Sequence, residues 1–156
     1  MSMPVLSPDI AGHVYQNSTA SSIPCIPSSD TLSSYSHTRQ RANQAFESVY
    51  EILKEHQEPN WDGDNATPVS QEACSAALRF LAMLPLTMPF PDLAAEPDGS
   101  IAMEWHISSS RTFLVSLSGR KVISYAGVFD KDAETYGKEP FEDSIPSIII
   151  SNIQRL

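Results

Sequence analysis

The residues of this chain that could take part in chemistry are few, and the first candidates are Glu104 and His106. They stand two residues apart in a stretch where apolar and polar residues alternate, so on a β-strand both side chains lie on one face. A carboxylate beside an imidazole can act as a general acid–base pair or supply half of a metal site. No third ligand or nucleophile follows at a fixed spacing, which favours a polar pair on the solvent face of a sheet.

The second candidate is the polar loop at residues 60–68, which contains Trp61, Asp62 and Asp64. Carboxylates at positions i and i+2 begin a calcium-binding loop. That pattern also needs an oxygen ligand, a glycine and a glutamate at three later positions. Those positions hold Ala66, Thr67 and Ala73. We therefore expect no metal here and interpret Asp62-Gly63 as a turn.

Two aromatic residues are candidates for contact with a partner. Trp61 lies in the polar loop, where a tryptophan either anchors the loop onto the core or stays exposed at a binding surface. Tyr125 lies on an expected strand, and the alternation alone does not say whether its face is buried. No catalytic residue, metal or cofactor is expected. The candidate binding residues are therefore Trp61, Asp62, Asp64, Glu104, His106 and Tyr125.

Helical periodicity flanks the loop and closes the chain. Apolar residues at spacings of three and four predict helices over residues 39–57 and 71–84, each followed by a proline that ends it. Thr38 and Ser70 are the expected N-caps of these two helices. A last helix is predicted over residues 145–155, although its three successive isoleucines would also suit a strand.

Period-two alternation predicts the sheet that carries Glu104, His106 and Tyr125. Strands are expected over residues 101–107, 113–117 and 122–129, with a short further strand near residues 93–96. Tight turns join them, so neighbouring strands are antiparallel. Residues 130–140 are expected to form a charged loop.

These elements predict an α+β fold with two N-terminal helices, an antiparallel β-meander of three to four strands and a C-terminal helix. An antiparallel sheet with one buried face needs a layer of helices on that face. We expect the helices to cover the side that bears Ile101, Met103, Trp105 and Ile107.

Composition divides the chain into an arm and one domain. Residues 1–38 contain ten serines, three threonines and four prolines but only two charged residues. Such a segment buries too little apolar surface to offset the entropy lost on ordering, so it is predicted to be a disordered arm. Residues 39–156 are expected to form a single compact domain, since a chain of that length can bury a core.

The charge balance bears on partners. Ten basic and 19 acidic residues give a formal net charge of −9. This charge disfavours direct binding to nucleic acid or an anionic membrane and favours a basic protein partner. Cys25 and Cys74 form neither a disulfide framework nor a zinc spacing, and no apolar stretch approaches the roughly 20 residues of a membrane span. We expect a cytoplasmic protein.

Several short motifs occur in a fixed order between about residues 40 and 156. They are Asn60-Trp61-Asp62-Gly63, Ala66, Pro68-Val69, Gly99, Ile101, Glu104-Trp105, Tyr125, Gly127 and Pro140-Phe141. Together they resemble a widespread group of small bacterial proteins for which no function is established. The resemblance implies a bacterial source, one compact domain and an association with toxin–antitoxin or phage-defence genes. One departure is Asp64, where the group has tyrosine or phenylalanine.

Three functions remain open on the sequence. The leading hypothesis is a non-enzymatic acidic protein-binding module, an antitoxin- or immunity-like partner of a basic toxin or defence protein. The second is a small-ligand or metal-dependent enzyme that uses Glu104 and His106. The third is a structural subunit of a larger bacterial complex. Nothing in the sequence indicates an oligomeric state.

Overall fold

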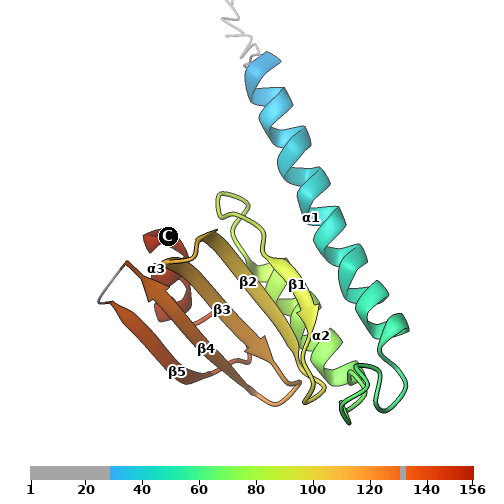
Figure 1. Ribbon diagram of the computed structural model, residues 1–156. Coiled ribbons are helices and arrows are strands. Elements are labelled where there is room, and N and C mark those ends of the chain that lie inside the picture. The colour runs from blue at the N-terminus through green and yellow to red at the C-terminus, as the bar shows by residue number, and fades with distance from the viewer. Residues whose placement is uncertain (1–28, 131–132) are drawn as a thin grey trace, which may run out of the picture.

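Three helices and one antiparallel sheet make up residues 29–130 and 133–156, which the computed structural model describes (Figure 1). The helices are α1 (Ser29–Glu55), α2 (Gln71–Met83) and α3 (Ser147–Arg155). The strands are β1 (Asp92–Ala95), β2 (Ile101–Ser108), β3 (Arg111–Leu117), β4 (Val122–Phe129) and β5 (Glu134–Pro140). The predicted α+β class is confirmed, whereas the sheet has five strands rather than three or four.

β5 lies where the charge pattern predicts a loop, so that prediction is wrong. Backbone pairing with β4 holds the strand from Val128↔Glu134 to Val122↔Pro140. No residue of β5 is fully buried. An edge strand needs only one paired neighbour and is commonly charged on its exposed side, so its composition does not distinguish it from a polar loop.

The strands follow one another in the order β1-β2-β3-β4-β5, which is a meander in which every neighbouring pair is antiparallel. Figure 1 shows α2 and α3 behind the sheet. We call the side towards these helices the covered face and the opposite side the open face. The covered face buries the residues predicted to meet the helices, Ile101, Met103 and Trp105.

Ile107 is predicted to lie on the covered face with these residues, but it is not buried, since 61% of its surface is exposed. The register between β2 and β3 shifts between His106 and Ser108, where the chain forms an irregularity of the β-bulge type. An extra residue in one strand changes which face the following side chain takes. Strict alternation therefore predicts the faces of β2 correctly only as far as His106.

α1 begins at Ser29, so the predicted start at residue 39 is wrong. Thr38 is not an N-cap but lies inside the helix, where its hydroxyl donates a hydrogen bond to the carbonyl oxygen of Ser34 at 3.0 Å. The N-terminal half of the helix extends past the sheet in Figure 1. Residues 1–28 of the predicted arm lie outside the described residues.

The remaining helices follow local signals closely. The side chain of Ser70 caps α2 by accepting a hydrogen bond from the backbone N–H of Ala73 at 3.0 Å, as predicted. The three successive isoleucines belong to a helix, because α3 spans them. Among the described residues no helix is both long enough and apolar enough to cross a membrane.

The core lies between α2, α3 and the covered face. Phe80 of α2 is its centre, with ring centroids 6.2 Å from Trp105 and 5.8 Å from Phe141. The C-terminal half of α1 closes the β1 side of this core with Ala45, Val49 and Ile52. β2, which carries Glu104 and His106, therefore packs against this core through its buried side chains.

Candidate functional site

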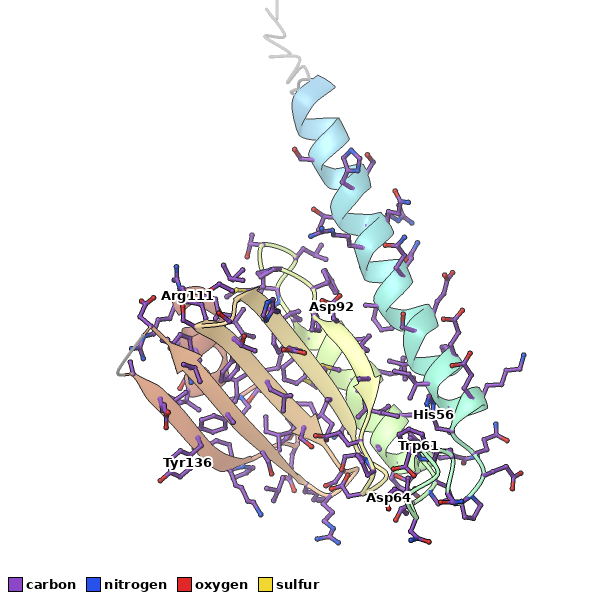
Figure 2. The ribbon with its side chains drawn as sticks, in the orientation of Figure 1. His56, Trp61, Asp64, Asp92, Arg111 and Tyr136 are labelled. Atoms are coloured by element: carbon purple, nitrogen blue, oxygen red, sulfur yellow. The ribbon has the colours of Figure 1, made fainter. Side chains whose placement is uncertain are left out.

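The predicted binding residues fall into three separate places, which are the loop between α1 and α2, strand β2, and strand β4 with Tyr125. Trp61, Asp62 and Asp64 belong to the loop between α1 and α2. Glu104 and His106 lie on the open face of β2, where Asp92 of β1 pairs with Glu104. Figure 2 shows Asp92 well away from Trp61 and Asp64. The six residues therefore do not form one site.

Trp61 anchors its own loop. Its indole N–H donates a hydrogen bond to the carbonyl oxygen of Thr67 at 3.0 Å. The ring meets His56 edge-on, with centroids 4.3 Å apart (Figure 2). The imidazole is itself fixed, because its Nδ1–H donates to the carbonyl oxygen of Ile52 at 2.8 Å. Of the two interpretations of this tryptophan, the geometry supports the anchor.

Asp62 organises the turn that follows the tryptophan. Its Oδ1 accepts hydrogen bonds from the backbone N–H groups of Asp64 at 2.8 Å and of Ala66 at 3.1 Å. The N–H of Asp64, followed by that of Ala66, holds the pKa of Asp62 below its ordinary value, because these bonds favour the carboxylate. Gly63 takes a φ of +82°, as a glycine in such a turn readily does. The predicted turn is therefore confirmed.

Tyr125 points towards the covered face, away from the other candidates. It pairs across the sheet with Val115 and Gly137, and its ring centroid is 6.0 Å from that of Phe113. A Cβ atom at Gly137 would lie 2.7 Å from the Tyr125 hydroxyl oxygen, so only a glycine leaves room for this ring. The half-buried tyrosine thus packs as part of the core.

Glu104 and His106 form a polar ladder with β3. Thr112, which pairs with His106, donates its hydroxyl hydrogen to the carbonyl oxygen of Ser108 at 3.1 Å. Its oxygen must then accept from His106, so Nδ1 of the imidazole carries the hydrogen across the 3.0 Å contact. Glu104 Oε1 lies 3.9 Å from the same nitrogen. In this arrangement His106 donates to the threonine oxygen, so it does not act as a base that activates the hydroxyl.

An open groove with a volume of about 820 Å³ borders this ladder. One wall is α1, and the other is the connection that leads into β1 together with the end of β2. We call it the acidic groove, because its lining includes four carboxylates, those of Glu47, Glu51, Asp92 and Glu104. Among the described residues that line it, the basic side chains are Arg41 and His106.

The groove also offers apolar surface. Its lining includes Phe90, Leu93, Ile107, Ile153 of α3 and Leu156, which directly follows α3. A concave surface that combines charged groups with apolar side chains can receive a partner chain. The lining of the groove includes two of the predicted binding residues, Glu104 and His106.

The contribution of α1 to this site is not predicted from the sequence. Glu47 and Glu51 stand one helical turn apart, a spacing that places two carboxylates side by side. That signal is visible in the sequence, but it does not reveal that Asp92 and Glu104 lie across from them. The contact between α1 and the β1 edge is a tertiary one, which local spacing does not encode.

Other reactive groups do not gather into a second centre. Within the described ranges, no three histidine, cysteine, aspartate or glutamate side chains are placed to hold a metal ion. Cys74 is buried in α2, and burial raises the pKa of its thiol, which disfavours the reactive thiolate. Lys121 and Glu142 form an exposed ion pair at 2.8 Å, a contact of small energetic weight.

Comparison with models of protein families, with curated proteins and with solved structures found no match to the chain.

Proposed function

We propose that the chain is a non-enzymatic, acidic protein-binding module of the bacterial cytoplasm, and that a basic segment of its partner occupies the acidic groove. The observation that carries the proposal is the position of four carboxylates around one partly apolar groove. Glu47, Glu51 and Asp92 are exposed and Glu104 is half-buried, so all four can meet a partner.

Charge supports a basic partner over other classes. The chain carries a net charge of −9, and the groove concentrates carboxylates at one place. A negative cleft with low-dielectric walls attracts cations and speeds the association of a basic protein. The same field repels nucleic-acid phosphates and anionic lipids.

The biological setting that fits this chemistry is that of an antitoxin- or immunity-like protein. Many toxins that act on nucleic acid are basic, since affinity for phosphates depends on lysine and arginine. An acidic partner that covers such a surface would block it. The resemblance of the Trp61-Asp62-Gly63 and Glu104-Trp105 motifs to a bacterial group associated with toxin–antitoxin and phage-defence genes points in the same direction.

The enzymatic alternative has weaker support from the same residues. The hydrogens of the His106 Nδ1 and the Thr112 hydroxyl are both committed within the ladder, and Glu104 and His106 stand on an open sheet face. General acid–base chemistry at neutral pH works best in a site that shifts the pKa of its groups and excludes water.

The test is affinity capture with the full-length chain as bait in lysate of the organism that encodes it. Two charge variants accompany the wild type. The groove variant combines Glu47→Gln, Glu51→Gln, Asp92→Asn and Glu104→Gln. The control variant combines four exposed positions outside the groove, Glu58→Gln, Asp64→Asn, Glu134→Gln and Asp143→Asn. Both variants are four units less negative than the wild-type charge of −9.

The proposal predicts that wild type and the control variant retain the same basic protein and that the groove variant does not. Because the two variants share one net charge, a difference between them reports position rather than total charge. Capture of an acidic protein, or equal capture by both variants, would refute the assignment of the groove.

A further inference from the structure

We infer that the groove receives its partner as an extended strand that adds to the free edge of β2 at His106, and that this strand alternates basic and aliphatic residues. The inference rests on the proposed function and deepens it, because it specifies the conformation and the sequence pattern of the bound segment. Its grounds are the backbone geometry of β1 and β2 and the chemistry of the groove.

β2 continues past the end of its neighbour. The register between β1 and β2 stops at Asp92↔Glu104, whereas β2 runs on to Ser108. Of the eight residues of β2, the part beyond Glu104 has a strand partner on the β3 side only. The bare edge faces the groove, whose lining includes Trp105, His106 and Ile107.

The alternation of backbone directions along β2 shows which N–H and C=O groups point to the free edge. The N–H of Glu96 donates to the carbonyl oxygen of Ser100 at 2.9 Å, so the backbone of Ser100 points towards β1. Alternate residues of a strand direct their N–H and C=O groups to the same side. Ala102, Glu104 and His106 therefore point that way too. Ala102 and Glu104 are opposite Ala94 and Asp92 of β1. His106 is therefore the next residue of β2 whose backbone could pair on this side.

The chain itself does not fill that pairing position. Phe90 would stand opposite His106 if β1 continued, but it lies between Pro89 and Pro91. No backbone hydrogen bond joins Phe90 to His106 in the part of the chain that the structure describes. The indole N–H of Trp105 donates to the carbonyl oxygen of Pro89 at 2.7 Å and holds this connection towards the covered face. The donor and acceptor of His106 are thus left for another strand.

The side-chain pattern of the bound strand follows from the open and covered faces of the sheet. A residue paired with His106 directs its side chain to the open face, where Asp92 and Glu104 lie on the adjacent rung, within reach of a lysine or arginine. Its two neighbours direct theirs to the covered face, where Leu93 is opposite the buried Met103. Phe90 and Leu93 both pack against the core and add apolar lining to the groove. Strand addition uses main-chain hydrogen bonds for affinity and alternate side chains for specificity. The bound segment is therefore basic at every second position and aliphatic between.

The probe is a synthetic eight-residue peptide in which lysine and valine alternate, tested against the full-length chain. Two N-methylated forms provide matched controls. The added strand takes the place of a longer β1 and is therefore antiparallel to β2, as β1 is. In an antiparallel pair the residue opposite His106 points its N–H towards β2, so methylation of the lysine amides removes the donors that would bond to His106. Methylation of the valine amides blocks only the outer edge. Charge, length and side chains are the same in all three peptides.

We expect the parent peptide and its N-methyl-valine form to bind with similar affinity and the N-methyl-lysine form to bind at least tenfold more weakly. Amide hydrogen exchange at His106 should slow at least tenfold when the parent peptide is bound. Equal binding of the two methylated forms, unchanged exchange at His106, or no binding of the parent peptide would each overturn the strand.

These outcomes are separable from those of the proposed function. If a basic protein is captured through the four carboxylates but the peptide does not slow amide exchange at His106, the groove stands as the binding site. The inference that the partner binds as an added strand is then rejected. If no basic protein is captured through the groove, the proposed function fails whatever the peptide does.

Discussion

The hydrogen bonds of His106 favour a structural role for its side chain over a catalytic one. The sequence places it beside Glu104, a pair that suits acid–base catalysis. In the structure its Nδ1–H is donated to Thr112, whose own hydroxyl hydrogen goes to the carbonyl oxygen of Ser108. The ladder leaves the side chains as surface groups, while the free backbone of the same residue becomes its more informative feature.

Gly119 provides a prediction at the same scale. Its φ is +75°, and a Cβ atom there would lie 2.4 Å from the Cβ of Glu72 at the start of α2. We predict that Gly119→Ala lowers the free energy of unfolding by about 3 kcal/mol, because a left-handed conformation and a steric clash add. Urea denaturation measures the change.

Gly63 is the matched control for that measurement. It has a φ of +82°, but no atom lies within 4 Å of the position that a Cβ atom would take there. Gly63→Ala should therefore cost only about 1 kcal/mol from the backbone conformation. Equal losses of unfolding free energy in the two variants would show that the turn between β3 and β4 does not pack closely against α2.

The sequence allows two roles for Trp61, an anchor of its loop or a residue at a binding surface, and a substitution can distinguish them. Trp61→Phe keeps an aromatic ring against His56 but removes the hydrogen bond to Thr67. We predict a loss of about 1 kcal/mol in unfolding free energy with no change in partner capture. Lost capture with unchanged stability would instead place this residue at the binding surface.

At the scale of elements, local signals predict most of the architecture and fail where tertiary context decides. The cap of α2, the faces of β2 up to His106 and the turn at Asp62 follow from nearest-neighbour chemistry. β5 escapes prediction because an edge strand needs little apolar character. α1 is predicted too short because its first residues are polar, and helix propensity is a weak signal in such a stretch.

The loop between α1 and α2 carries a pH dependence of defined sign. The folded state holds the pKa of Asp62 below its ordinary value, so the carboxylate stabilises the fold above that ordinary value, about 3.9, and this contribution is lost as the pH falls through the folded pKa. We predict that wild type is more stable than Asp62→Ala at pH 7 and that the difference shrinks as the pH drops below about 4. Urea midpoints at both pH values measure it, and a constant difference would contradict the assignment.

At the scale of the whole molecule, charge and topology meet at one place. α1 brings Glu47 and Glu51 to the β1 side of the sheet, and the short first strand leaves β2 bare beside them. The overall negative charge is readable from composition. Its concentration in a groove is not, because residues about 40 to 60 positions apart form the two walls.

The open face is the second exposed surface at this scale. Leu114, Ala126 and Tyr136 lie side by side across three strands. The exposed fraction of Tyr136 is 81%, and Figure 2 labels this side chain. In the part of the chain that the structure describes, no helix covers this face (Figure 1). A strand added at His106 would extend the sheet and widen the same surface.

Ionic strength should affect association at the groove more than elsewhere. Steering by exposed carboxylates is screened over about 10 Å at 0.1 M salt and about 3 Å at 1 M salt. We predict that the association rate of the captured partner falls about tenfold or more between 0.05 and 0.5 M salt for wild type, and less steeply for the groove variant. Stopped-flow or surface-binding kinetics measure both slopes, and parallel slopes would argue against steering by these four residues.

The affinity of the purified partner for three full-length proteins, measured by calorimetry, tests the central claim most directly. The proteins are wild type, the groove variant and the control variant, of which the last two share one net charge. The account predicts that the groove variant binds at least tenfold more weakly than wild type and that the control variant binds within about twofold of it. Equal affinity for all three proteins, or a loss confined to the control variant, would contradict the placement of the binding site in the acidic groove.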